Sequence, residues 1–190
     1  MNADFLLIQR MKRGEEDAFD VFVRKYYESI LNYCRYRCFD AGYAEDLAQE
    51  TFVCFFKNLS YYRFQGKTQN YLYTVAGNLC KDFYRKKKDI PTAQEELSGY
   101  NIVNPIEAAM ERMSVEEAVR ALPQEQQEVV ILHYFQGMKL RETAEILQVG
   151  LPLVKYRLRQ AKAGLARFMG KEEAYGDRKK NPGICGADVD

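Results

Sequence analysis

The chain contains no tryptophan and one histidine, His133, and only five cysteines and five prolines. The cysteines are odd in number and none form a CxxC pair, so the sequence predicts neither a disulfide framework nor a zinc knuckle. Because the single histidine is distant in sequence from every cysteine, we expect no metal and no other cofactor. A nucleotide-binding glycine loop and a catalytic triad are also missing, so the sequence does not predict an enzyme.

Long apolar segments are missing from the N-terminal region. Its apolar run covers four residues, Phe5 to Ile8, far fewer than a signal-peptide core or a membrane span requires. We therefore expect a cytoplasmic protein without membrane insertion. The 190 residues are 47% hydrophobic and 29% charged, which is ordinary for a globular protein with one domain or two small ones.

The net charge of +1 conceals an uneven distribution of charged residues. Basic residues cluster at 81–88 and again at 155–171, and the stretch between the two clusters is mainly acidic. Two basic regions separated by an acidic spacer are typical of a chain with two nucleic-acid contacts.

Apolar residues recur at helical spacing in three segments of the N-terminal half. The segments are 16–37, 43–59 and 70–88, and a loop with the sequence SYYRFQG separates the second from the third. We expect these three helices to form one bundle. Residues 90–105 contain two prolines, a glycine and no sustained periodicity, which is typical of an extended, charged tether.

The C-terminal half predicts a second small bundle. Helices are expected from near Pro105, before Pro123 and over Val129–Phe135, followed by a helix-turn-helix over Leu140–Met169. The predicted fold class is therefore all-α, with two small helical bundles joined by a flexible acidic linker. The expected division is a first bundle at 1–89, a linker at 90–110, a second bundle at 111–170 and a polar tail at 171–190.

The segment LRETAEILQVGLPLVKYRLRQAKAGLARFM has the pattern of a helix-turn-helix. One side of its second helix is apolar, and the opposite side carries Lys155, Tyr156, Arg159 and Gln160. These groups suit a surface that meets phosphates and base edges in a major groove. A merely solvated helix face is the alternative. The preceding helix favours DNA binding, because the small side chain of Ala144 permits a close helix crossing.

The loop SYYRFQG carries Tyr61, Tyr62 and Phe64, and Tyr71 begins the next helix, which ends in the basic run 85–88. Exposed rings can stack on unpaired bases, and neighbouring cations can hold the phosphate backbone. The pattern therefore predicts a site for single-stranded nucleic acid. In the alternative interpretation, Tyr71 and one loop tyrosine close the core of the bundle.

The same helix carries Asn78 and Asp82 one turn apart, alongside Lys81 and Arg85. An amide and a carboxylate can select base edges, whereas lysine and arginine favour phosphates. A solvated helix face explains these four residues equally well.

Five segments together resemble the extracytoplasmic-function (ECF) sigma factors, which are small bacterial RNA polymerase subunits with only the second and fourth conserved sigma regions. From about Gly14 to Met169, the matching segments are EEDAFDVFVRKYY, AEDLAQETFVCFFKNL, YLYTVAGNLCKDFYRKKK, ALPQEQQEVVILHYFQGMKLRETAEILQV and LVKYRLRQAKAGL. The resemblance implies that the first bundle is region two, that the second is region four, and that the chain has no catalytic chemistry of its own.

The resemblance also implies the partners and the residues that meet them. Core RNA polymerase would bind Asp46, Gln49, Glu50 and Phe52. The melted minus-ten promoter element, with one base flipped out, would bind Tyr61, Tyr62, Phe64, Tyr71, Asn78, Asp82, Arg85 and Lys86. The duplex minus-thirty-five element would bind Lys155, Tyr156, Arg159 and Gln160. An anti-sigma factor is a further implied partner.

A stand-alone helix-turn-helix regulator that binds duplex DNA as a dimer is the main alternative function. It accounts for the C-terminal segment but leaves the aromatic loop and AEDLAQETF unexplained. A nucleic-acid-modifying enzyme would require a cluster of acids, bases or metal ligands.

The helix-turn-helix departs from the family pattern at three positions. Lys139 stands where the family has a serine cap, Gln148 where it has a turn glycine, and Gly150 where it has a second serine cap.

Overall fold

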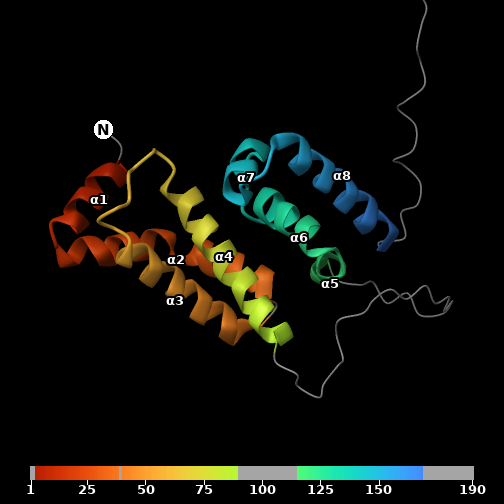
Figure 1. The fold of residues 1–190 in the computed structure, drawn as a ribbon, viewed down its shortest axis with the longest axis horizontal. Coiled ribbons are helices and arrows are strands. Elements are labelled where there is room, and N and C mark those ends of the chain that lie inside the picture. The colour runs from red at the N-terminus through yellow and green to blue at the C-terminus, as the bar shows by residue number, and fades with distance from the viewer. Residues whose placement is uncertain (1–2, 39, 90–114, 169–190) are drawn as a thin grey trace, which may run out of the picture.

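The computed structural model describes residues 3–38, 40–89 and 115–168, and every regular element in these ranges is a helix (Figure 1). The first bundle consists of α1 (Ala3–Lys12), α2 (Glu16–Cys38), α3 (Ala41–Lys57) and α4 (Thr68–Asp89). The second consists of α5 (Val115–Arg120), α6 (Gln124–Val130), the π-helical η1 (Ile131–Phe135), α7 (Leu140–Leu147) and α8 (Leu151–Phe168). The predicted all-α fold of two bundles is confirmed. The predicted linker, the helix near Pro105 and the tail lie outside the described residues.

Aromatic rings dominate the core between α2 and α3. Phe22 of α2 stacks on Phe55 of α3, with ring centroids 4.7 Å apart and an interplanar angle of 7°. Both side chains are fully buried, and Leu72 and Ala76 bring α4 onto the same core. Because apolar residues recur every three or four positions, each of the three helices buries one face, as the sequence predicts.

The sequence pattern does not predict the short helix α1, whose apolar run covers only four residues. Its buried side chains are Leu7, Ile8 and Met11. The Phe5 ring packs on Phe64 at a centroid distance of 5.8 Å, and the Lys12 ammonium donates a hydrogen bond to the Tyr62 carbonyl at 2.7 Å. Helix α1 therefore supports the aromatic loop between α3 and α4.

The helix-turn-helix forms from α7 and α8, which bury the predicted apolar side of α8 through Val154, Leu158 and Ala161. The Lys139 backbone N–H donates to the Glu142 carboxylate at 2.9 Å. Glu142 thus supplies one half of a capping box by accepting from the Lys139 N–H, whereas the Lys139 ammonium cannot accept from the first-turn N–H groups.

A backbone conformation that disfavours side chains with a Cβ ends α7. Gln148 has φ 55° and ψ 40°, which is the left-handed helical region. Glycine is the usual residue there, because a Cβ crowds the neighbouring carbonyl oxygen. The turn therefore forms in spite of Gln148, supported by the hydrogen bond from the Val149 N–H to the Ala144 carbonyl at 3.0 Å.

Replacing the strained residue should stabilise the protein. We expect Gln148→Gly to raise the free energy of unfolding by about 1 kcal/mol, since glycine adopts the left-handed conformation without the Cβ clash. Urea denaturation followed by circular dichroism measures the change. Gln148→Ala is the matched control, because it removes the amide but keeps the Cβ, and an equal gain in this variant would contradict the backbone explanation.

The two bundles lie side by side, with α4 next to α7 and α2 next to η1 (Figure 1). The Arg37 guanidinium of α2 pairs with the Glu128 carboxylate of α6 at 2.9 Å, and both side chains are buried. The Tyr73 hydroxyl of α4 donates to the Gln136 side-chain oxygen at 2.9 Å. We call this side-by-side packing the closed arrangement.

Candidate polymerase and promoter interface

The loop between α3 and α4 presents one strongly exposed ring. Tyr61 is 84% exposed, whereas Tyr62 is 9% exposed and Phe64 is partly buried against Phe5. Tyr71, at the beginning of α4, is 37% exposed. Of the predicted stacking residues, the structure therefore brings Tyr61 and Tyr71 to the surface.

Tyr62 agrees with the alternative interpretation, in which one loop tyrosine closes the core of the bundle. Its ring packs against Phe55 and Tyr71 at centroid distances of 5.2 and 4.9 Å, and its hydroxyl lies 3.5 Å from the Thr68 hydroxyl. Burial raises the pKa of the Tyr62 phenol. Tyr62 is the loop tyrosine that closes the core, because α1 holds its backbone and turns the ring inward.

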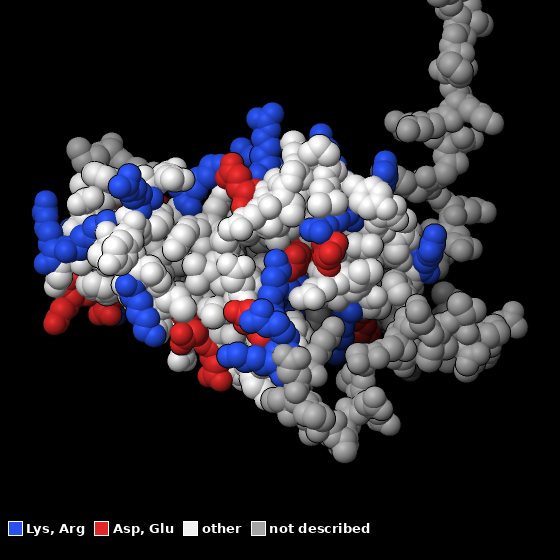
Figure 2. Space-filling view, in the orientation of Figure 1, with Lys and Arg blue, Asp and Glu red and all other residues white. Residues whose placement is uncertain are grey.

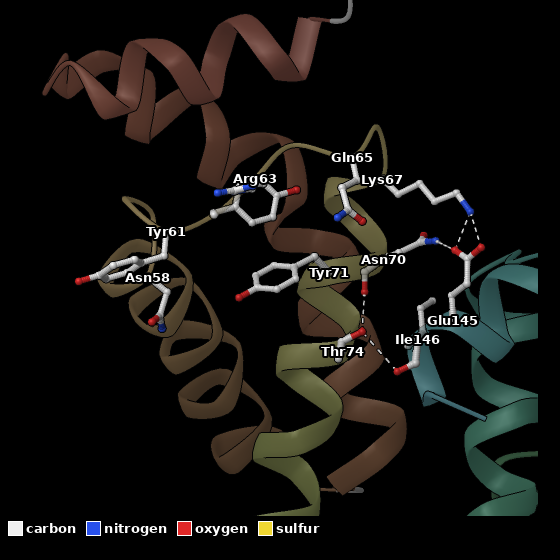
Figure 3. A pocket seen from close by; sticks show the side chains of 11 residues that line it. Asn58, Tyr61, Arg63, Gln65, Lys67, Asn70, Tyr71, Thr74, Glu145 and Ile146 are labelled. Carbon is white, nitrogen blue, oxygen red and sulfur yellow. Dashed lines mark hydrogen bonds and ion pairs between the residues drawn. The ribbon is translucent and has the colours of Figure 1, made fainter.

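A cavity of about 710 Å³ opens beside the loop (Figure 3). Its lining offers aromatic rings, side-chain amides and cations, drawn mainly from the loop and α4. Eleven residues line it: Asn58, Tyr61, Tyr62, Arg63, Gln65, Lys67, Asn70, Tyr71, Thr74, Glu145 and Ile146. This combination can stack on a flat heterocycle, hydrogen-bond its edge and neutralise a neighbouring phosphate.

One wall of the cavity comes from the second bundle. The Lys67 ammonium donates to both carboxylate oxygens of Glu145 on α7, at 2.7 and 2.6 Å. The Thr74 hydroxyl of α4 lies 3.3 Å from the Ile146 carbonyl, to which it can donate (Figure 3). Hydrogen bonding from Lys67 lowers the pKa of Glu145, so this carboxylate is ionised at neutral pH.

The basic end of α4 is exposed but carries both signs of charge. Asn78, Asp82, Arg85 and Lys86 all face solvent, and Arg85 pairs with Asp82 at 3.0 Å. Lys81 reaches the Glu128 carboxylate at 3.5 Å. Figure 2 shows blue side chains next to red ones near this end of α4. An arriving phosphate would therefore compete with Asp82 for Arg85.

The predicted outer face of α8 points to solvent. Lys155, Tyr156, Arg159 and Gln160 are all exposed. The Arg159 guanidinium lies over the Tyr156 ring, 5.7 Å from its centroid, which orients both side chains on the same turn of the helix. Because the opposite side of α8 is buried, this face is available to a DNA groove.

The exposed face of α3 is mainly acidic, and its exposed apolar residues include Val53. Asp46, Gln49 and Glu50 face solvent, and Val53 beside them is 40% exposed. Positions 46, 49, 50 and 53 share one face of a helix, which is the spacing that could have identified Val53.

Phe52 does not belong to that exposed face. It is 4% exposed, and its ring packs near Phe22 and Tyr27 at centroid distances of 6.3 and 6.2 Å. Helical geometry places position 52 with Ala48 and Phe55 on the inner side of α3. In this structure Phe52 therefore anchors α3 in the bundle, and its contact with polymerase stays a prediction.

Among the described residues, no group of three or more His, Cys, Asp and Glu side chains is placed to hold a metal ion. The His133 Nδ1–H donates a hydrogen bond to the Met138 carbonyl at 2.8 Å. Cys34, Cys38 and Cys80 are free and buried. Within the ranges the structure describes, no helix combines the length and apolar character needed to cross a membrane.

Two segments match known families. Residues 22–90 match sigma-70 region 2 and residues 112–165 match sigma-70 region 4. Together they span more than half of the chain and define its class as a sigma-70-type initiation factor.

Individual relatives narrow this class. The chain is 30% identical to the ECF RNA polymerase sigma factor BldN of Streptomyces coelicolor, with 86% of this chain and 64% of BldN covered. It is 28% identical to the ECF RNA polymerase sigma factor SigW of Bacillus subtilis, with 84% and 93% covered. It is 31% identical to the RNA polymerase sigma factor YlaC of Bacillus subtilis, with 82% and 94% covered. The chain belongs to the ECF sigma factors.

Solved structures share the fold. CnrH, solved in complex with the cytosolic domain of CnrY, has a TM-score of 0.69 at 19% identity, with 90% of this chain and all 100% of CnrH covered. The sigma factor RpoE of Bartonella quintana, solved with the anti-sigma factor NepR, has a TM-score of 0.67 at 16% identity, with 82% and 98% covered.

As a sigma factor, the chain binds core RNA polymerase, recognises promoter DNA and promotes strand opening. The stand-alone helix-turn-helix regulator is not favoured, because region 2 is matched as well as region 4.

The two loop tyrosines should differ sharply in their effect on stability. We expect Tyr62→Ala to lower the free energy of unfolding by about 3 kcal/mol, because it leaves a cavity between α3 and α4. Tyr61→Ala should change it by less than about 0.5 kcal/mol, because that ring is exposed. Urea denaturation measures both. Tyr62→Phe is the control that keeps the buried ring, and equal losses for Tyr61→Ala and Tyr62→Ala would contradict the assignment.

Proposed function

We propose that residues 1–89 bind both polymerase and the melted strand, and that residues 111–170 read duplex DNA. The single observation that carries this proposal is the cavity between the α3–α4 loop and α4, with an exposed tyrosine at its mouth. A stand-alone duplex-binding protein has no need of a ring that stacks on unpaired bases.

The outer face of α3 is the proposed polymerase contact. Asp46, Gln49 and Glu50 offer hydrogen-bond acceptors and negative charge, and Val53 supplies a small apolar centre. Such a face fits a partner helix that presents cations around an apolar residue. Phe52 supports this contact indirectly, by holding α3 in the bundle.

The cavity is the proposed site of a flipped base of the minus-ten element. The base would stack on Tyr61 or Tyr71, while the Asn70 amide reads its edge and Lys67 takes a neighbouring phosphate. Because a base can enter only after it is unpaired, its capture shifts the duplex toward the open state. The exposed end of α4, with Asn78, Asp82, Arg85 and Lys86, extends this surface along the strand.

The outer face of α8 is the proposed contact with the minus-thirty-five element. Lys155 and Arg159 suit phosphates and guanine edges, and Gln160 can pair with adenine. Tyr156 packs beside Arg159 and limits the freedom of its guanidinium.

A protein inhibitor and a cytoplasmic site of action complete the proposal. CnrH and RpoE share this fold, and each was solved with a partner protein, which for RpoE is an anti-sigma factor. We infer an anti-sigma partner for this chain as well. The chain would act in the cytoplasm, where RNA polymerase acts. It would work by binding its partners, without catalytic chemistry of its own.

Removing the exposed ring tests the cavity assignment. We expect Tyr61→Ala to reduce promoter opening about tenfold, because one stacked base is worth roughly 1 to 3 kcal/mol. The assay is permanganate reactivity of promoter thymines with holoenzyme, on a promoter first selected by transcribing genomic fragments in vitro. Tyr61→Phe retains the ring and should retain opening. Wild-type permanganate reactivity with Tyr61→Ala would sink the assignment.

Changing the cations of α8 tests the duplex contact. Lys155→Ala and Arg159→Ala should each weaken binding of holoenzyme to the selected promoter by about 1 to 3 kcal/mol. The measurement is a titration followed by fluorescence anisotropy. A fork template without the upstream duplex is the control, and its binding should not change. Equal losses on both templates would show that these residues act elsewhere.

A further inference from the structure

The exposed ring of Tyr61 is carried by a short stretch of backbone that one ammonium group holds. The Nζ of Lys12, in the last turn of α1, donates to the Tyr62 carbonyl at 2.7 Å and lies 3.4 Å from the Ser60 carbonyl oxygen. These two carbonyls belong to the residues on either side of Tyr61. The Lys12 ammonium therefore bridges the loop across the residue with the proposed stacking ring.

The bridge restricts the main chain at this point. Because peptide units are planar, only the φ and ψ angles of Tyr61 and Tyr62 separate the Ser60 carbonyl from the Tyr62 carbonyl. The Tyr61 and Tyr62 N–H groups both donate to the Asn58 carbonyl, at 3.1 and 3.0 Å. Donors and acceptors of this turn are thus both held, and the direction of the Tyr61 side chain is set by contacts that do not involve its ring.

The Tyr61 ring itself gains little support from packing. It is 84% exposed, whereas the Phe64 ring of the same loop packs on Phe5. An exposed side chain loses conformational freedom when it stacks on a base, and a backbone that is already fixed reduces this loss. The orientation of the Tyr61 ring before a strand arrives therefore depends on the backbone, and so on Lys12.

Helix α1 gives the ammonium a firm support. Ile8 and Met11 are buried in the bundle, and Asp4 of α1 pairs with Lys25 of α2. Within the described residues, Lys12 forms no ion pair with a carboxylate. Its N–H groups are therefore available to the two loop carbonyls.

We propose that Lys12 is a positioning residue for promoter opening, which presents the Tyr61 ring to an unpaired base by bridging the carbonyls on either side of it. This inference rests on the proposed function, because it takes Tyr61 as the ring on which the base stacks. Lys12 contributes to strand capture through Tyr61, without contacting DNA itself.

Permanganate reactivity of promoter thymines with holoenzyme tests this role. We expect Lys12→Met, which keeps the aliphatic stem and removes the ammonium, to reduce opening about threefold to fivefold. Lys12→Arg retains N–H donors and should restore opening. Arg13→Met removes an equal charge from the next position, which is also exposed, and should leave opening unchanged. Equal losses for Lys12→Met and Arg13→Met would show a general attraction to DNA and would overturn the proposal.

Combination with Tyr61→Ala separates positioning from direct contact. If Lys12 acts through the Tyr61 ring, Lys12→Met should cause no further loss of opening in a chain that already carries Tyr61→Ala. If the ammonium instead binds a DNA phosphate or supports the fold in general, its loss would multiply that of Tyr61→Ala. Multiplicative losses would therefore refute positioning, as would wild-type opening by Lys12→Met alone.

A spectroscopic measurement follows the loop without DNA. The sequence has no tryptophan, so Tyr61→Trp places a single fluorophore at this exposed position. In time-resolved anisotropy of the free full chain, adding Lys12→Met should raise the amplitude of nanosecond local motion of this fluorophore about twofold. Adding Arg13→Met should not. Equal amplitudes with and without the Lys12 ammonium would show that it does not hold the loop.

The two proposals fail in different ways. If Tyr61→Ala holoenzyme opens promoters like the wild type, the ring captures no base and the proposed function is wrong, whatever the anisotropy shows. If Tyr61→Ala is defective but Lys12→Met opens promoters like the wild type, the strand site stands and positioning by Lys12 is wrong.

Discussion

A buried charge pair between α2 and α6 determines how the two bundles of this sigma factor meet. Burial alone would lower the pKa of Arg37, but Tyr33 and Glu128 beside it raise that pKa, so the guanidinium remains charged. Only its Nη2 reaches Glu128, whereas Nε and Nη1 have no hydrogen-bond partner within the described residues. A pair satisfied in this incomplete way specifies one arrangement without making it very stable. The interface is thus suited to form and to separate.

The three proposed contact surfaces differ in how this packing leaves them. The outer faces of α3 and α8 carry Asp46 and Lys155 among their exposed residues, and both faces are accessible in the closed arrangement. The cavity beside Tyr61 instead has a wall from α7. Two of the proposed surfaces are therefore accessible in the closed arrangement, while the third shares a wall with the second bundle.

Helical periodicity predicted most of the fold and the exposed side of α8, whereas the proposed surface on α3 came from the family resemblance. A helix that buries Val154 and Leu158 must turn Lys155 and Arg159 outward, and the same rule applies to α3. Adjacent loop aromatics follow no such rule, so the pattern could not tell Tyr61 from Tyr62. Glu145 could not be found at all, because its partner Lys67 lies 78 positions away and only tertiary packing brings them together.

Helix α1 has a consequence for comparisons among relatives. The match to sigma-70 region 2 begins at residue 22, yet Phe5 and Lys12 support the loop that carries Tyr61. Substitutions in this preceding helix can therefore tilt or loosen the loop without altering any residue of the matched region. A comparison restricted to the matched region therefore leaves out the helix on which this loop rests.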